Sequence, residues 1–310
     1  MGQLVDGKWH AKDLPRTGAN GEFIRAESPF RSWLGGSDNE FPADSGRYHL
    51  FINAGCPWAY RTLLYRSLKG LSDHISVSLT EPAMGPEGWT FGAQTETLLG
   101  AQHIHDVYSA ADSKFTGRCT VPVLWDKEAA TIVNNESSEI IRMMNSAFDE
   151  LPGVADVDYY PEGLQSEIDA FNEEIYVTVN NGVYRCGFAQ SQAAYEQAYD
   201  ALFATLDKLN TLLGTQRYLC GDVLTEADWR LFATLVRFDL AYYSQFRCNR
   251  NRLTDYEHLW PYTRDLYQHD GVAETVDFEA IKGIYFGGRP PHIIPKGPEI
   301  DFDAPHGRGG

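Results

Sequence analysis

Hydrophobic and polar positions along the first half of the chain predict a small domain of mixed strands and helices. Residues 48–52 form a short apolar run typical of a buried strand, and an Asn-Ala-Gly sequence ends it. A helix is predicted from Pro57, whose missing N–H costs nothing in a first turn, and Gly70 ends its apolar stripe. Residues 74–79 alternate between apolar and polar side chains, which predicts a second strand.

The same domain continues after a long predicted loop that passes Trp89 and His105. Residues 121–125 and 131–133 predict two strands joined by a polar turn, and a helix is predicted from about 137 to 145. The order β-α-β followed by β-β-α is that of a layered α/β domain of thioredoxin-like size.

The second half of the chain is predicted to be helical. Residues 151–163 contain two prolines, two glycines and three acidic residues, and we interpret them as a linker. Four later segments have apolar residues three and four positions apart: 164–179, 191–213, 226–242 and 259–267. The third has a start signal in Thr225 and Asp228, which are spaced as a capping box.

The two ends of the chain show no sustained period. We expect an irregular arm at 1–45, whose five Trp and Phe residues favour packing onto a domain, and an irregular Pro- and Gly-rich tail at 287–310. Between them we expect a thioredoxin-like domain at 46–150, the linker at 151–163 and an all-helical domain at 164–286. The expected fold class is therefore α+β with two domains.

Composition narrows the possible partners. The 310 residues are 43% hydrophobic and carry a formal charge of −17, which disfavours binding to nucleic acid or to an acidic membrane surface. We find no apolar run of about 18 residues and no secretory signal, so we expect a cytoplasmic protein with no membrane partner. The excess of carboxylates fits either adaptation to a high-salt cytoplasm or ordinary variation in surface charge without such adaptation.

The cysteines point to a reactive thiol. There are five, widely spaced and without a CxxC pair, which suggests neither a disulfide framework nor a zinc site, and we expect no metal. Cys56 precedes Pro57 at the predicted start of a helix, where unpaired amides and the helix dipole favour a thiolate. The competing interpretation is a buried cysteine that only packs, but a strand-to-helix turn is a surface position.

Ala59 stands where a two-thiol oxidoreductase would carry its resolving cysteine. Cys56 then has no local partner and must be regenerated by an external thiol, and glutathione is the common one in a reducing cytosol. The sequence therefore predicts a glutathione-dependent, single-thiol reductase.

Two segments of the same domain are suited to hold a tripeptide. A cis peptide before Pro122 would present the backbone of Val121 to an extended peptide, although the proline also fits a simple edge-strand break. Glu136 and Ser137 open the next predicted helix, where they suit the ammonium and carboxylate of a γ-glutamyl group. Ordinary capping by Asn135 or Ser137 explains that segment about as well.

Five motifs occur in order along the chain: Cys56-Pro57-Trp58-Ala59, Gly88-Trp89-Thr90-Phe91, Gly117-Arg118 through Val121-Pro122-Val123-Leu124-Trp125-Asp126, Asn135-Glu136-Ser137-Ser138-Glu139-Ile140-Ile141 and Asn181-Gly182-Val183-Tyr184. With them the sequence resembles the glutathionyl-hydroquinone reductases, the Xi class of glutathione transferases, over nearly its whole length. The resemblance implies a thioredoxin-like domain followed by an all-helical domain, in a homodimer.

The resemblance also implies a reaction and roles for particular residues. Cys56 would attack the sulfur of a glutathionyl-hydroquinone, and free glutathione would then release oxidised glutathione. The leaving aromatic carbon needs a proton, and the family pattern gives that role to Tyr184. Tyr242 and Tyr285 match tyrosines that are expected to hydrogen-bond the thiolate.

Further residues match positions that contact glutathione in the family. These are Trp89, Arg118, Cys119, Thr120, Val121, Glu136 and Ser137. Cys119 departs from the pattern, because a β-branched residue is more usual there. We interpret it, like Cys186, as a packing residue rather than a second reactive thiol.

Other functions remain open at this stage. A conjugating transferase would hold glutathione with Ser or Tyr, so Cys56 disfavours it. A deglutathionylase or dehydroascorbate reductase would share the single thiol, and the tyrosines favour a quinone substrate over these. Outside enzymes, the same two-domain shape serves as a binding module, which would not need Cys56.

Overall fold

The computed structural model describes residues 2–12, 16–35, 40–92, 98–288 and 290–309. The chain divides into two units, neither of which is continuous in sequence. Unit 1 consists of Met1–Pro15, Glu27–Val157 and Glu274–Ile294, and unit 2 of Arg16–Ala26, Asp158–Ala273 and Pro295–Gly310. These boundaries differ from the predicted domains, because the arm and the tail are each divided between the units and the segment 274–286 lies in unit 1, not in the helical unit. Residues 1, 13–15, 36–39, 289 and 310 of the arm and tail lie outside the described residues.

Unit 1 is built on a mixed sheet in which the strands lie in the order β4-β3-β5-β6. The strands are β3 (Tyr48–Ile52), β4 (Ile75–Leu79), β5 (Val123–Asp126) and β6 (Thr131–Asn134). β3 runs parallel to β4 and antiparallel to β5, and β5 runs antiparallel to β6. All five residues of β3 are buried, which is why apolar side chains occupy every position of this strand except that of His49.

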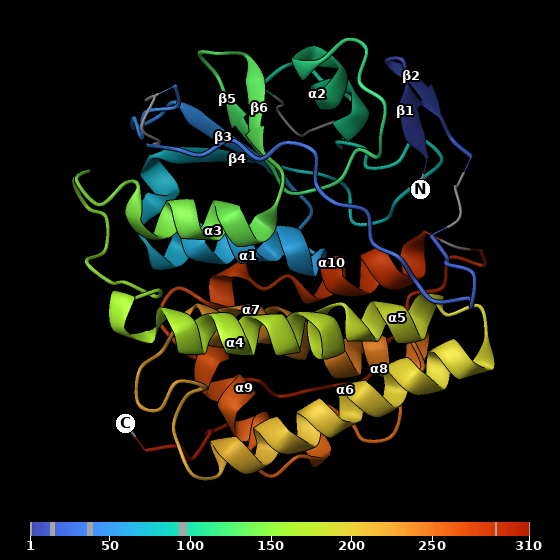
Figure 1. The fold of residues 1–310 in the computed structure, drawn as a ribbon, viewed down its shortest axis with the longest axis vertical. Helices are drawn as coiled ribbons and strands as arrows, with labels where there is room; N and C mark the ends of the chain where they lie inside the picture. The colour runs from blue at the N-terminus through green and yellow to red at the C-terminus, as the bar shows by residue number, and fades with distance from the viewer. Residues whose placement is uncertain (1, 13–15, 36–39, 93–97, 289, 310) are drawn as a thin grey trace. The chain divides into compact units, whose positions relative to one another are not determined.

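Helices cover the sheet of unit 1 and connect its strands. α1 (Pro57–Leu68) and α3 (Ser137–Ser146) pack side by side along one face, as Figure 1 shows. Shorter elements are η1 (Leu71–Asp73), α2 (Ile104–Ala111), η6 (Ala273–Thr275), α10 (Phe278–Lys282) and η7 (Gly283–Gly287). The β-α-β, β-β-α order predicted from the sequence is confirmed, and α2 replaces part of the predicted loop around His105.

The predicted irregular arm begins with a hairpin instead. β1 (Gln3–Val5) pairs antiparallel with β2 (Lys8–His10). Asp6 and Gly7 link the two strands with positive φ angles of 47° and 72°, and Asp-Gly is a preferred pair for a two-residue hairpin turn. Leu4 also exchanges backbone hydrogen bonds with Gly117, at 2.9 and 3.0 Å, so the hairpin is tied to the loop before β5.

Unit 2 is helical, as predicted. Its elements are η2 (Glu162–Leu164), α4 (Gln165–Ile175), η3 (Tyr176–Asn180), α5 (Gly182–Phe188), α6 (Gln192–Leu213), α7 (Glu226–Leu235), η4 (Phe238–Tyr242), α8 (Tyr243–Gln245), η5 (Leu253–Asp255) and α9 (Leu259–Tyr267). The capping box of α7 is confirmed, since the Thr225 amide donates to Asp228 Oδ2 at 2.9 Å. Two predicted helices, 164–179 and 226–242, change into π-helical turns before they end.

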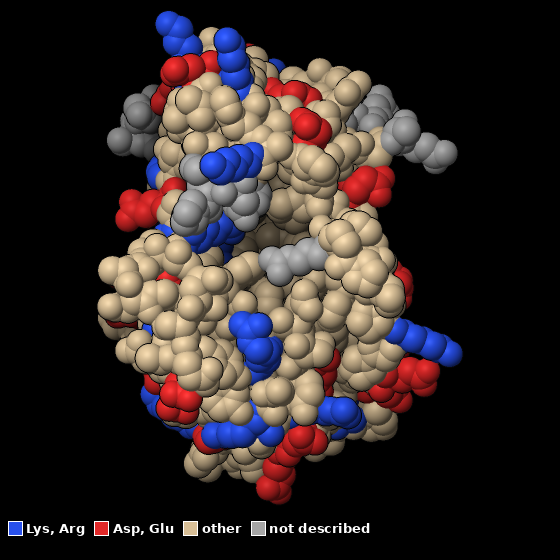
Figure 2. All heavy atoms as spheres, turned by 90° about the vertical axis from the view of Figure 1, so that its right-hand side faces the viewer, with Lys and Arg blue, Asp and Glu red and all other residues tan. Residues whose placement is uncertain are grey.

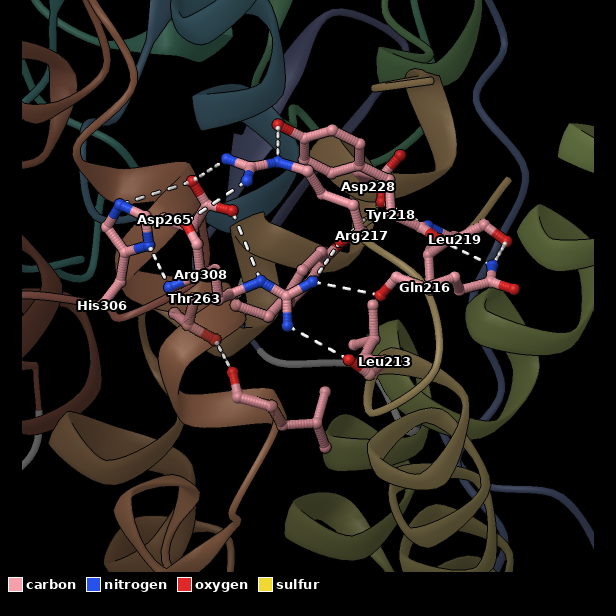
Figure 3. A network of polar contacts seen from close by, with 12 residues as sticks. Leu213, Gln216, Arg217, Tyr218, Leu219, Asp228, Thr263, Asp265, His306 and Arg308 are labelled. Atoms are coloured by element: carbon pink, nitrogen blue, oxygen red, sulfur yellow. Dashed lines mark hydrogen bonds and ion pairs between the residues drawn. The ribbon is translucent and has the colours of Figure 1, made fainter. Parts of the chain in front are cut away.

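The tail residues of unit 2 are fixed by side-chain contacts rather than by a helix or strand of their own. Arg308 donates to the carbonyl of Leu213, the last residue of α6, at 3.2 Å and pairs with Asp265 at 3.4 Å (Figure 3). Such a cation at the end of α6 satisfies carbonyls that have no partner within the helix. Within the described residues, no helix is both long and apolar enough to span a membrane.

Candidate active site

Cys56 is the N-cap residue of α1, at the turn that follows β3. At 6% exposed it is buried, so the expectation of a surface position was wrong. The buried side chain of Asn53 holds this turn, because its Oδ1 accepts the amides of Gly55 and Cys56 at 3.0 and 3.1 Å. Its Nδ2 donates to Thr80 Oγ1 at 3.0 Å and to the Glu81 carbonyl at 2.8 Å. The first-turn amides of a helix lack partners within the helix, so this position favours a thiolate sulfur.

The turn is covered by the late segment of unit 1. A Cβ added to Gly55 would lie 2.3 Å from the carbonyl oxygen of Ala280 in α10 and 2.9 Å from Ile284 Cγ2 in η7. Glycine is therefore required for this close approach. Tyr285 follows in η7 and is 8% exposed, so the structure places this predicted tyrosine in the same unit as Cys56. Its hydrogen bond to the thiolate stays a prediction.

The residues before β5 are positioned by Tyr108 of α2. Its hydroxyl donates to the Thr120 carbonyl at 3.0 Å, accepts the Thr120 amide at 3.2 Å and accepts from Asn135 Nδ2 at 2.8 Å. Tyr108 thereby ties the Thr120 segment to the start of α3. Just after Thr120, the Val121–Pro122 peptide bond is cis, as the sequence suggested. Pairing of Val121 with glutathione stays a prediction.

Cys119 is an unreactive thiol in this setting. It is 3% exposed, and burial raises its pKa to about 12. A thiol that stays protonated at neutral pH is a poor nucleophile, so the packing interpretation is supported. Cys186, in α5, is fully buried as well.

Glu136 itself caps α3, in place of the predicted Asn135 or Ser137. Its carboxylate accepts the amide of Ser138 at 3.1 Å and the hydroxyls of Ser138 and Ser28 at 2.9 and 3.1 Å. Burial raises the pKa of the Glu136 carboxyl group, whereas these hydrogen bonds and the nearby Arg61 lower it. The lowering effects are larger together, so the pKa lies below its usual value. Glu136 is thus an anion fixed beside Ser137, as binding of an ammonium group requires.

Trp89 and Arg118 lie in separate loops of unit 1. Trp89 is 5% exposed, and its carbonyl accepts the amide of Ile104 at 2.9 Å, which ties the loop to the start of α2. Arg118 is half-buried. Their contacts with glutathione stay predictions.

Tyr184 and Tyr242 belong to unit 2, where they share one aromatic cluster. Their ring centroids are 6.1 Å apart, and Phe246 lies 5.2 Å from Tyr184 and 5.4 Å from Tyr242. The guanidinium of Arg25 lies 4.9 Å from the Tyr184 ring centroid and donates to Asn181 Oδ1 at 2.9 Å. The structure therefore brings these two tyrosines together, and their action on Cys56 stays a prediction.

A π-helical turn lies at or just before each of the three predicted tyrosines. η3 ends at Asn180, shortly before Tyr184, while η4 contains Tyr242 and η7 contains Tyr285. In such a turn the amide bonds five residues back, as Asn181 does to the Tyr176 carbonyl at 2.8 Å. The extra residue rotates the following side chains relative to a regular helix.

Sequence reasoning missed the supporting residues Asn53, Tyr108 and Arg25. Asn53 had a signal, since an Asn at the end of a strand, here two residues before Gly55, often accepts hydrogen bonds from nearby amides. Tyr108 lies four residues after Ile104 and one after Val107, a helical spacing that predicts α2. Arg25 had no local signal, because its partners Asn181 and Tyr184 are more than 150 residues away in the sequence.

Comparisons with known proteins agree with this arrangement. Residues 55–147 match the family model "Glutathione S-transferase, N-terminal domain", and residues 192–265 match "Glutathione S-transferase, C-terminal domain". The chain is 48% identical to glutathionyl-hydroquinone reductase YqjG of Escherichia coli over 99% of this chain and 98% of the relative. It is 47% identical to glutathionyl-hydroquinone reductase PcpF of Sphingobium chlorophenolicum, with 96% of each chain covered.

Two solved structures share the fold over nearly the whole chain. The glutathione-bound structure of YqjG has a TM-score of 0.90 at 46% identity, with 99% of each chain covered. The Xi class transferase of Natrialba magadii has a TM-score of 0.91 at 44% identity, covering 99% of this chain and 96% of the other.

Proposed function

The chain belongs to the glutathione transferase family, in its Xi class of glutathionyl-hydroquinone reductases, and from that premise we propose that it reduces glutathionyl-hydroquinones with glutathione as cosubstrate. The observation that carries the mechanism is the position of Cys56 at the N-cap of α1, where Asn53 fixes the turn. Ala59, three residues later, leaves no resolving cysteine in the motif. Glutathione must therefore complete the cycle.

The proposed first step forms a mixed disulfide. The Cys56 thiolate attacks the glutathionyl sulfur, an S–S bond forms, and the bond from that sulfur to the aromatic carbon breaks. The electron pair of the broken bond goes to the aromatic carbon, which takes a proton from Tyr184 and becomes the free hydroquinone. Tyr242 and Tyr285 would donate hydrogen bonds that stabilise the thiolate before attack.

The proposed second step regenerates the enzyme. The thiolate of free glutathione attacks the glutathione sulfur of the mixed disulfide, giving oxidised glutathione and the Cys56 thiolate. The proton lost by that glutathione restores Tyr184. The proposed glutathione-binding residues are Trp89, Arg118, Cys119, Thr120, Val121, Glu136 and Ser137.

The test is to supply glutathionyl-menadiol and glutathione and to follow oxidised glutathione. The parent protein is expected to form it, and Cys56→Ala is expected to lose at least 99% of the rate, about 3 kcal/mol in the barrier. Cys220→Ala is the matched control, because Cys220 is also buried and burial raises its pKa to about 11. Full activity of Cys56→Ala contradicts the mechanism, and faster turnover of dehydroascorbate than of the quinone adduct contradicts the substrate class.

Location and assembly are part of the same proposal. All five cysteines are free, as expected of a protein in a compartment where glutathione keeps thiols reduced, so we place the enzyme in the cytoplasm. We also propose a homodimer, by resemblance to the family, and light scattering during gel filtration tests it by mass. A mass of one 34.8 kDa chain contradicts the dimer.

A further inference from the structure

Three metal-ligand side chains of unit 1 converge outside the proposed glutathione site. Glu87, His103 and His105 each offer one ligand atom, and these atoms lie within 4.8 Å of one another. Glu87 lies in the loop before Trp89, and the histidines flank the first residue of α2. We call these three residues the Glu-His-His cluster.

The two imidazole rings are held in place without a ligand. His103 and His105 stack with centroids 4.7 Å apart and an angle of 9° between their planes. Trp9 of β2 also stacks on His105, with a centroid distance of 4.5 Å and an angle of 20°. The indole N–H of Trp9 donates to the carbonyl of Pro86, beside Glu87, at 3.2 Å. The stack holds both rings beside Glu87, and because an imidazole binds a metal through a lone pair in its ring plane, the two rings must tilt relative to each other to share one ion.

A carboxylate lies beside the Nδ1 atom of each histidine, and the His103 side chain also accepts the backbone amide of Asp106. Asp106 Oδ1 lies 3.2 Å from His105 Nδ1, and Asp106 Oδ2 lies 3.4 Å from His103 Nδ1. The backbone amides of Gln102 and His103 donate to Asp106 Oδ2 at 3.0 and 2.9 Å and orient it. Metal-binding histidines generally have such a carboxylate or carbonyl partner at the second nitrogen.

Among the described residues, the Nε2 atom of His105 has no hydrogen-bond partner. It is buried and lies 3.6 Å from Glu87 Oε2, which is too long for a hydrogen bond. Two ligands bound 2.0–2.1 Å from one tetrahedral zinc ion are separated by about 3.3 Å. The gap between these two atoms is thus close to the separation that a shared ion would require.

We propose that the Glu-His-His cluster binds one divalent cation of the zinc class. Two imidazoles and one carboxylate suit Zn²⁺, Co²⁺ or Ni²⁺, whereas Mg²⁺ and Ca²⁺ prefer a full set of oxygen ligands. A water molecule completes the tetrahedron, because the half-exposed Glu87 side chain leaves that side open to solvent. The ion links the loop that carries Trp89 to the start of α2.

The test is calorimetric titration of the full-length Cys56→Ser protein with ZnCl₂ at pH 7. Removing Cys56 eliminates a competing thiolate. We expect one equivalent to bind, with at least a tenfold weaker Kd for His103→Ala and for Glu87→Gln. His10→Ala is the matched control, because His10 is an exposed histidine of β2 that does not belong to the cluster, and it is expected to leave the Kd unchanged.

Two further measurements keep the test decisive. Glu87 has a side chain that is 51% exposed, so Glu87→Gln is expected to keep the parent melting temperature even if a histidine variant does not fold. The Co²⁺ complex is expected to show tetrahedral d–d bands without thiolate charge-transfer bands. The absence of a stoichiometric site, an unchanged Kd in Glu87→Gln, or sulfur ligation would each overturn the proposal.

Discussion

At the residue scale, Arg25 places a positive charge over the ring of Tyr184. The guanidinium lies 4.9 Å from the ring centroid, and in the proposed mechanism it would stabilise the phenolate formed when Tyr184 donates its proton. Arg25→Met keeps much of the apolar stem and removes the charge. We expect kcat with glutathionyl-menadiol to fall about fivefold, the equivalent of ~1 kcal/mol, with little change in KM for glutathione.

A comparable arginine serves as the control for that variant. Arg247 lies 5.6 Å from the ring centroid of Tyr195 in the same unit, so Arg247→Met removes a similar stacked cation at a tyrosine without a proposed catalytic role. It is expected to keep kcat. If Arg25→Met changes only the melting temperature, the residue has a structural role alone.

A second prediction at the residue scale concerns His49, which is expected to make the stability of the protein depend on pH. It lies buried in β3, with Nδ1 2.7 Å from Ser76 Oγ and Nε2 3.0 Å from Ser78 Oγ, and burial lowers its pKa from 6.5 to about 4. Between these values the unfolded chain binds a proton that the folded chain does not. Stability is therefore full above pH 6.5 and falls as the pH decreases towards 4, by up to about 3 kcal/mol.

Urea unfolding at pH 7.0, 5.5 and 4.5 measures this effect. His49→Gln retains a side chain that can bond to the two serines but cannot titrate, so we expect a smaller decrease in the urea midpoint between pH 7.0 and 4.5. His10→Gln, at an exposed position of β2, is expected to retain the parent slope. An equal slope in the His49 variant would contradict the assignment.

At the scale of elements, the contact between α10 and the catalytic turn is sensitive to a single methyl group. In Gly55→Ala the added Cβ would meet the Ala280 carbonyl oxygen at 2.3 Å, so α10 must move away from the turn. We expect a loss of about 2 kcal/mol in unfolding free energy and a large loss of activity. Gly85→Ala is the matched control, because its Cβ would have nothing within 4 Å. Parent-like activity of Gly55→Ala would show that α10 does not support the turn.

Elements with a strong local pattern could be predicted from the sequence. The strand predicted at 48–52, the start of α1 at Pro57 and the helix at 259–267 agree with the structure, because their apolar period and end signals are local. The strand predicted at 74–79 begins one residue later, at Ile75. The hairpin of β1 and β2 was missed although Asp6-Gly7 indicates it, since each strand has only three residues and shows little alternation.

The orientation of the candidate tyrosines could not be predicted in this way. A π-helical turn adds a residue, so the 3.6-residue period that locates apolar faces no longer assigns a side chain to a face after it. Tyr242 and Tyr285 lie within such turns, and Tyr184 shortly follows one. Their identification therefore depended on family resemblance, whereas Cys56 could be identified from its strand-turn-helix setting.

At the scale of the whole molecule, the charge of −17 predicts stabilisation by salt. We attribute the effect to overall repulsion between carboxylates, and on the face drawn in Figure 2 acidic and basic side chains are interspersed. Raising KCl from 0.1 to 1 M shortens the Debye length from about 10 to about 3 Å. We expect the melting temperature to rise over this range, and a constant or falling melting temperature would contradict the expectation.

The boundaries between the two units could not be predicted from the sequence either. Composition placed boundaries at the Pro- and Gly-rich segments around 151–163 and 287, as it does for domains that follow one another along a chain. In the structure, Arg16–Ala26 joins the helical unit and Glu274–Ile294 joins the thioredoxin-like unit. Contacts between residues more than 200 positions apart, such as Tyr60 with Thr275 at 3.0 Å, leave no local pattern in the sequence.

The late segment of unit 1 has a consequence for how the protein is made. A ribosome releases Cys56 early, but Ala280, whose carbonyl covers the neighbouring Gly55, emerges only after nearly all of unit 2 has been synthesised. Unit 1 therefore cannot complete its fold while it is still the only part outside the ribosome. A nascent chain cut short before α10 carries the thiol without its finished surroundings, so the catalytic turn is among the last parts of the molecule to mature.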